Sequence, residues 1–244
     1  MKMVTLASLR GAPGVTTTAL LLAASTATER ADAVVVEADL DGGVLAVRHG
    51  LGREPGLITF AAASEDDPGS WRHHAQNAGG VPALVGPDVP SACVALWRGA
   101  GDRISHRLVR SDGLAFVDAG RFRAPLPIFA ASDLVLMVVR PIAEDLLTLR
   151  HHLPALTATT RGRVAAVVVG DGPYRRPEIQ RDLGIGVMAE LPEDPSAAAV
   201  VRTIGVGSNR LHRSRLGRAA AGLAATVAAA VTQGGPEAWV AKAS

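Results

Sequence analysis

The stretch SLRGAPGVTTT, residues 8–18, decides how this sequence folds. The apolar run Val4–Leu9 leads into it, and an alanine- and leucine-rich run, Thr16–Thr28, follows it. These runs predict a strand and a helix, and the glycines and proline between them predict a tight turn. Glycines let backbone N–H groups turn toward an anion, and the helix N-terminus adds a partial positive charge. The stretch therefore predicts an anion site; the alternative is an ordinary connection in which Thr16 or Thr17 caps the helix.

Further apolar runs recur along the chain, several of them continuous rather than alternating, which is typical of strands covered on both faces. These runs are Val34–Glu37, Val81–Val85, Leu114–Val117, Leu134–Val139, Val164–Val169 and Val187–Leu191. Helix-like segments separate many of them: Ser91–Trp97, Ala143–Leu156 and Pro177–Leu183. Strands that alternate with helices predict an α/β fold with a doubly wound, mostly parallel sheet of about seven strands and helices on both faces.

The length of 244 residues suits one sizeable α/β domain or two small ones. The sequence has no repeat and no clear linker, so we expect one domain, which we place at residues 1–232. A last helix, from about Arg210 to Val231, is expected to pack on the core, and residues 233–244 are expected to form a loose tail. The N-terminus lacks the apolar stretch and cleavage site of a secretory signal. The run Ala219–Val231 is shorter than the ~20 residues of a membrane-spanning helix. We therefore expect a cytoplasmic protein with no transmembrane segment.

The composition excludes several kinds of chemistry. One cysteine, Cys93, permits neither an intramolecular disulfide nor a cysteine-based zinc site. A formal net charge of +2 gives no strong attraction to nucleic acid. The only lysines are Lys2 and Lys242. Any binding or catalytic role that requires a lysine in the middle of the chain is therefore excluded.

Carboxylates follow two of the predicted strands. The second strand runs into Glu37 and Asp39, and the run Leu114–Val117 ends at Asp118. The carboxyl ends of parallel strands face the usual ligand crevice of such sheets. A carboxylate at that edge can hold Mg²⁺ through water. The alternative is that Asp39 and Asp41 only shape a loop.

The turn resembles the deviant Walker A loop of the MinD/ParA family of P-loop ATPases, whose pattern is K-G-G-x-G-K-[ST]-[ST]. Arg10 stands at the first lysine; Gly11, Gly14, Thr16 and Thr17 match, Ala12 replaces the second glycine, and Val15 replaces the main lysine. Residues 37–39 are similar to the family's D-x-D element, and residues 114–120 to its Walker B strand. Residues 132–141 and 191–194 are similar to its aDxvllVvxP strand and lPxD element.

The resemblance implies a set of site residues. Those implied to bind the nucleotide are Gly11, Ala12, Pro13, Gly14, Val15, Thr16, Thr17, Pro192 and Asp194. Thr16, Glu37 and Asp118 are implied to hold Mg²⁺, partly through water. Asp39 is implied to position the attacking water, and Arg10 to reach the phosphates of a partner subunit. Asp171 stands where many relatives carry an asparagine that contacts the base.

The loss of the lysine sets the expected function. A lysine–phosphate contact is worth roughly 1.5–3 kcal/mol, so Val15 predicts weak binding of ATP or ADP with Mg²⁺ and slow or absent hydrolysis. The resemblance implies a homodimer that recruits a partner protein of a positioning or assembly machine at a pole, a septum or a membrane-associated site. Within the family, the TadZ/CpaE-like branch fits the missing lysine. The alternatives are a pseudo-ATPase scaffold and, less favoured, a partition ATPase that binds DNA nonspecifically through arginines near the last helix.

Overall fold

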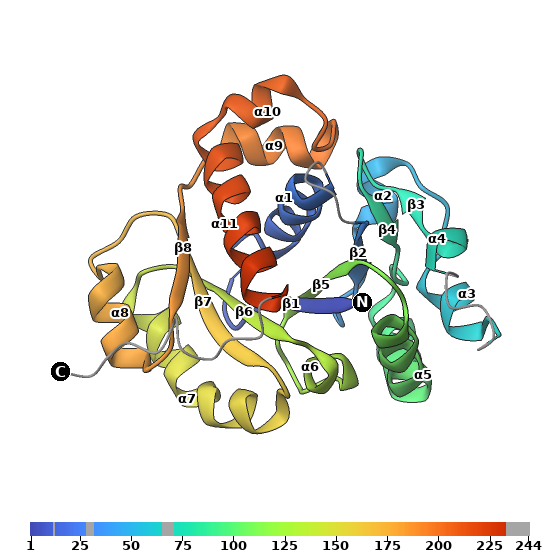
Figure 1. The fold of residues 1–244 in the computed structure, drawn as a ribbon, viewed down its shortest axis with the longest axis horizontal. Helices are drawn as coiled ribbons and strands as arrows, with labels where there is room; N and C mark the ends of the chain where they lie inside the picture. The colour runs from blue at the N-terminus through green and yellow to red at the C-terminus, as the bar shows by residue number, and fades with distance from the viewer. Residues whose placement is uncertain (12, 28–31, 65–70, 233–244) are drawn as a thin grey trace.

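Eight strands form one sheet at the centre of the computed structural model (Figure 1). The structure describes residues 1–11, 13–27, 32–64 and 71–232. The strand order is β3-β4-β2-β5-β1-β6-β7-β8, and all neighbours run parallel except β3 and β4. The strands are β1 (Lys2–Ser8), β2 (Ala33–Glu37), β3 (Gln76–Asn77), β4 (Pro82–Leu84), β5 (Leu114–Arg121), β6 (Leu134–Val139), β7 (Arg163–Val169) and β8 (Val187–Leu191).

Helices cover both faces of the sheet. One face carries α1 (Val15–Ala27), α2 (Leu45–His49), α9 (Pro195–Thr203), α10 (Asn209–Arg213) and α11 (Arg215–Thr232). The other carries α3 (Leu57–Ala62), α4 (Trp71–His74), α5 (Pro90–Arg110), α6 (Pro127–Ala131), α7 (Ala143–Thr159) and α8 (Arg176–Leu183). In Figure 1, α1, α9 and α11 stand above the sheet and α6 and α7 below it. The sheet thus separates two apolar cores.

The middle strands are apolar because both of their faces are buried. All six residues of β6 are buried, as are all five of β2. In β5 the buried run continues through Asp118, which pairs in register with Leu6 of β1 and with Glu37 of β2. A carboxylate thereby reaches the carboxyl end of the sheet at its centre.

The predicted α/β fold is confirmed. Each of the seven predicted strands is present, with bounds shifted by at most four residues. The eighth strand, β3, has two polar residues and pairs antiparallel with β4 at the sheet edge. So short a polar strand has no periodicity by which sequence could reveal it.

The C-terminal helix differs from the prediction in one respect. The structure divides it at Ser214 into α10 and α11, because the Ser214 hydroxyl accepts the Gly217 N–H at 2.9 Å and caps a new helix. Gly217 lies directly against the end of α10, since an added Cβ would be 2.1 Å from the Leu211 carbonyl oxygen.

The expected core packing of this region is confirmed. Its predicted apolar positions are all buried: Leu211, Leu216, Leu223, Val227 and Val231. Among the helices that the structure describes, none is long and apolar enough to cross a membrane. The predicted tail, residues 233–244, lies outside the described residues.

Candidate functional site

The turn between β1 and α1 opens at the carboxyl end of the sheet. Gly11 and Gly14 have φ angles of +63° and +95°, a region that favours glycine. The Gly14 carbonyl accepts the Thr18 N–H at 2.8 Å, so the earlier N–H groups of α1 face out of the helix end. An added Cβ on Gly14 would meet nothing within 4 Å, which leaves open space beside the turn. The backbone here is therefore suited to an anion.

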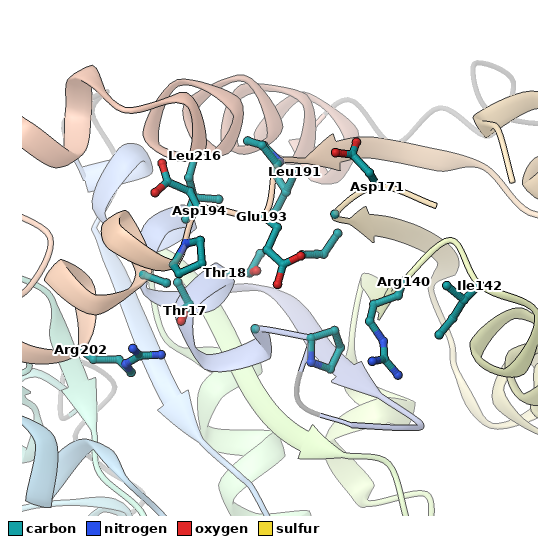
Figure 2. A pocket seen from close by; sticks show the side chains of 17 residues that line it. Thr17, Thr18, Arg140, Ile142, Asp171, Leu191, Glu193, Asp194, Arg202 and Leu216 are labelled. Atoms are coloured by element: carbon teal, nitrogen blue, oxygen red, sulfur yellow. The ribbon is translucent and has the colours of Figure 1, made fainter. Parts of the chain in front are cut away.

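A cavity of about 430 Å³ lies beside this turn (Figure 2). Pro13, Gly14 and Thr17 line it from the turn, and Pro192 and Asp194 line it from the segment after β8. The fold thus brings together five predicted nucleotide-binding residues from two distant parts of the sequence. The volume lies within the range of small-molecule sites in proteins.

The far wall of the cavity is acidic. Asp194 accepts the Ala197 N–H at 2.9 Å and so caps α9, as well as lining the cavity. Glu193 and the exposed Asp171 also line the wall, and Figure 2 shows the Glu193 side chain extending toward the turn. An anionic group in this cavity would therefore be favoured at the turn, where backbone N–H groups and Arg140 lie, rather than beside Asp171 and Asp194.

Asp118 lies next to the start of α1. Its side chain is buried, with 1% of the residue exposed, and accepts hydrogen bonds from the Thr16 hydroxyl and, at 3.1 Å, from the Gly120 N–H. Burial raises the pKa of Asp118 from its ordinary value to about 6, although these two hydrogen bonds oppose the rise. A hydroxyl and a carboxylate in contact beside a glycine turn that can bind an anion are suited to Mg²⁺.

Glu37 is close to Asp118, but its carboxylate has backbone partners. Oε1 accepts the Val44 and Leu45 N–H groups at 2.6 and 2.9 Å, and Oε2 accepts the Gly86 N–H at 2.9 Å. Burial raises the Glu37 pKa, and these three donors counteract that rise. Glu37 therefore caps α2 and fastens the loop after β4. Asp118, and not Glu37, is the carboxylate bonded to Thr16.

Asp39 lies half-buried above the end of β5. Its carboxylate accepts the Asp41 N–H at 2.9 Å, and burial is the main cause of its raised pKa. Gly120 makes this position possible: its φ is +55°, and a Cβ there would lie 2.0 Å from the Asp39 Cγ. Asp41 itself pairs with Arg123 through two hydrogen bonds of 2.8 and 2.9 Å. The fold thus gathers Asp39 and Asp118 near the turn.

The other predicted turn residues have different surroundings. Val15 is the first residue of α1, is 6% exposed and belongs to the apolar core on that face. It brings no charge to the turn. Arg10 is exposed and is not among the residues that line the cavity. Ala12 lies outside the described residues.

The sequence does not assign the following three cavity-lining side chains to the ligand site, and it indicates Arg202 only as one of the arginines near the last helix. Thr18, Arg140 and Arg202 line the cavity together with the predicted residues. A signal for Arg140 was present in the sequence, because it directly follows the buried strand β6 and so lies at the ligand edge of the sheet. No group of three or more His, Cys, Asp or Glu that could hold a metal occurs in the described part of the chain. A Mg²⁺ ion here would thus need phosphate or water ligands as well.

No protein-family model matches the sequence, and no curated protein matches it. Solved structures match it over almost its whole length. The ParA family ATPase of Chlorobium tepidum has a TM-score of 0.77 at 16% identity, over 92% of this chain and 97% of that one. The chain has the MinD/ParA fold.

Two MinD structures agree with this finding. The septum site-determining protein MinD of Pyrococcus horikoshii, complexed with Mg-ADP, has a TM-score of 0.74 at 15% identity, over 93% of this chain and 95% of that one. The MinC:MinD cell division complex of Aquifex aeolicus gives a TM-score of 0.72 at 12% identity, over 93% and 96%. At such identities the likeness establishes the MinD/ParA fold and leaves the activity to be argued from the site.

Proposed function

We propose that this chain is a nucleotide-binding protein of the MinD/ParA family that binds ADP or ATP weakly with Mg²⁺ and hydrolyses ATP slowly or not at all. The observation that carries the proposal is the Thr16–Asp118 hydrogen bond beside a glycine turn that opens into a cavity of about 430 Å³. The P. horikoshii MinD, which shares the fold, is complexed with Mg-ADP. A bound Mg²⁺ would supply neutralisation of phosphate charge.

The chain's own residues would divide the work. The turn from Gly11 to Thr17 would bind phosphates through backbone N–H groups, with the Thr16 hydroxyl and Asp118 holding the metal, Asp118 through water. Pro192 and Asp194 would border the base. Asp39 would orient a water; its carboxylate is half-buried, and this burial raises its pKa. Arg10, exposed on the turn, would reach the phosphates bound by a partner subunit.

Val15 accounts for the weak binding of ADP and ATP that we propose. The missing charge-assisted contact is worth roughly 1.5–3 kcal/mol, which corresponds to about one to two orders of magnitude in affinity. The structure adds that Val15 packs in an apolar core, so the turn does not hold a cation at this position. The rate of phosphoryl transfer would fall by a larger factor than the affinity, because a lysine at this position also offsets charge on the transferred group.

Calorimetry with ADP and ATP in the presence of Mg²⁺ tests the proposal. We expect dissociation constants well above those of an intact P-loop, and any residual ATPase activity to disappear in Asp39→Ala. Val15→Lys would increase both binding and hydrolysis if its side chain turns from the core toward the turn. Complete absence of binding at millimolar nucleotide would contradict the proposal.

We further propose that the chain acts as a dimer that recruits a partner protein, in the manner of the TadZ/CpaE-like branch, from the cytoplasm to a pole or a membrane-associated machine. The A. aeolicus MinD, which shares the fold, forms a complex with MinC. Size-exclusion chromatography with and without ATP tests the dimer. A monomer under both conditions would contradict this part of the proposal.

A pseudo-ATPase scaffold is the first alternative, and the burial of Val15 favours it. In that case the cavity would be vestigial, and the dimer face and the outer surface would act. Gly14→Val would fill the open space beside the turn and block nucleotide. Partner recruitment that survives Gly14→Val would favour the scaffold over the nucleotide-dependent protein.

A partition ATPase is the second alternative, supported by a basic surface on α9, α10 and α11. Residues 195–232 contain no Asp or Glu. They carry five exposed arginines: Arg202, Arg210, Arg213, Arg215 and Arg218. Such a surface can bind DNA phosphates without sequence preference. Salt-sensitive DNA binding that is lost when Arg213, Arg215 and Arg218 are replaced by alanine would favour this alternative.

A further inference from the structure

Arg140 lies against the glycine turn, although it comes from a different strand. It directly follows β6, and its guanidinium is so close that a Cβ on Gly11 would lie 3.5 Å from Nη2 and 3.7 Å from Cζ. Arg140 also lines the cavity, as Figure 2 shows. A second cationic side chain, Arg202, lies on the opposite side of the cavity in that view. Of these two, Arg140 is the cation next to the turn.

Asp145 holds Arg140 in this position. The Asp145 side chain is 3% exposed and accepts Arg140 Nε and Nη2, each at 3.0 Å, and the Arg140 backbone N–H at 3.2 Å. The carboxylate thus orients both the backbone and the guanidinium of Arg140. Two of the five guanidinium N–H groups are used, which leaves three for another acceptor. The arginine side chain is 47% exposed, so a ligand can reach it.

The charge around Arg140 indicates what it can contribute. Paired with Asp145 and close to Glu144 and Glu193, the guanidinium is compensated by carboxylates. Its contribution is therefore charge-assisted N–H donation to a group in direct contact, rather than a positive field across the whole cavity. Arginine suits this purpose, because its planar fork matches the oxygens of a phosphate group. A purely structural pair would need neither the exposure nor the position beside the turn.

We propose that Arg140 donates hydrogen bonds to the phosphates of the bound nucleotide, within the same chain, in place of the lysine that is absent at position 15. This inference rests on the proposed nucleotide site. It assigns a phosphate contact to the residue that directly follows β6, outside the Walker A-like turn. It also explains how a turn with a buried valine could retain phosphate affinity.

Calorimetric titration of the full chain with adenosine, ADP and ATP, in Mg²⁺ buffer, tests the proposal. In Arg140→Gln we expect about tenfold weaker binding of ADP and ATP, the effect of one lost charged hydrogen bond, with adenosine affinity unchanged. Glutamine can still donate to Asp145, so the buried carboxylate keeps a partner. Arg140→Lys keeps a charged donor but lacks the planar fork, so its ADP affinity should lie between those of the unaltered chain and Arg140→Gln. Arg150→Gln is the control, because Arg150 pairs with Asp182 at 3.4 Å outside the cavity.

The results separate this inference from the proposed function. If the unaltered chain binds none of the three ligands, both the proposed function and the role of Arg140 are refuted. If it binds ADP and Arg140→Gln binds ADP equally well, the inference alone is refuted. A uniform loss for adenosine, ADP and ATP would show that Arg140 only supports the fold, which also overturns the inference. Failure of Arg140→Lys to exceed Arg140→Gln would do the same, since the two side chains differ in charge.

Discussion

Replacement of Asp118 by asparagine should stabilise this protein at neutral pH, although it removes a residue of the proposed metal site. The Asp118 carboxyl is buried, and its pKa is raised to about 6 from an ordinary value of 3.8. The folded state therefore binds this proton more tightly than the unfolded state does. As a result, the free energy of unfolding falls as the pH rises from about 4 to about 6.

The magnitude follows from the size of the shift. A difference of about two pKa units corresponds to about 3 kcal/mol at pH 7.5. Asparagine avoids this penalty but weakens the hydrogen bonds from Thr16 and Gly120, a loss of about 1 kcal/mol. We therefore expect Asp118→Asn to be more stable than the unaltered protein by about 2 kcal/mol at pH 7.5. Near pH 4.5 the two opposing effects should cancel.

Urea unfolding followed by circular dichroism, in metal-free buffer at pH 4.5 and 7.5, measures this difference. The control is Asp182→Asn, which removes an exposed carboxylate that pairs with Arg150 and so relieves no buried charge. At pH 7.5 the expected gain corresponds to an increase of several degrees in melting temperature for a chain of this length. An Asp118→Asn protein that is less stable at pH 7.5, by an amount independent of pH, would refute the reasoning.

Three further substitutions test other contacts by urea unfolding at pH 7.5. Glu37→Ala leaves three backbone N–H groups without their acceptor, and we expect a loss of about 2–5 kcal/mol even though a buried charge is removed as well; unchanged stability would contradict the capping role. Gly113→Ala should lose about 2–4 kcal/mol, because φ is +107° and the Cβ would lie 2.3 Å from the Asp32 carbonyl oxygen. Leu223→Ala, on the buried side of α11, should lose about 2–5 kcal/mol, whereas Leu147→Ala should lose much less, because Leu147 is 53% exposed. Similar losses would argue against core packing of α11.

Features that depend on neighbours in sequence were the most predictable. The run Leu134–Val139 coincides with β6, because continuous burial requires continuous apolarity. The turn at residues 10–17 was equally visible, since its glycines and the hydroxyl residues after them are adjacent in the chain. The break at Ser214 was less visible, because an apolar spacing that fits one helix also fits two helices joined by a capping serine.

Features that depend on tertiary contacts could not be predicted in the same way. The sequence predicts Glu37 and Asp118 as metal ligands, and the structure adds that the Glu37 carboxylate also accepts backbone N–H groups seven, eight and 49 residues away. Neither residue type nor spacing reveals these backbone partners. The position of Arg140 beside Gly11 likewise depends on the tertiary fold, because the two residues are far apart in the sequence.

The three backbone hydrogen bonds to Glu37 have a consequence for signalling. They hold the start of α2 and the loop after β4, and the Gly43 N–H adds a bond of 2.7 Å to the Pro87 carbonyl. The segment that carries Asp39 is therefore held on both sides by hydrogen bonds within the chain. Binding would lose little conformational entropy in ordering it. For the same reason, we expect the conformation of this segment to differ little between the ADP-bound and ATP-bound forms. A partner that distinguishes ADP from ATP would then have to contact the nucleotide itself or a second subunit.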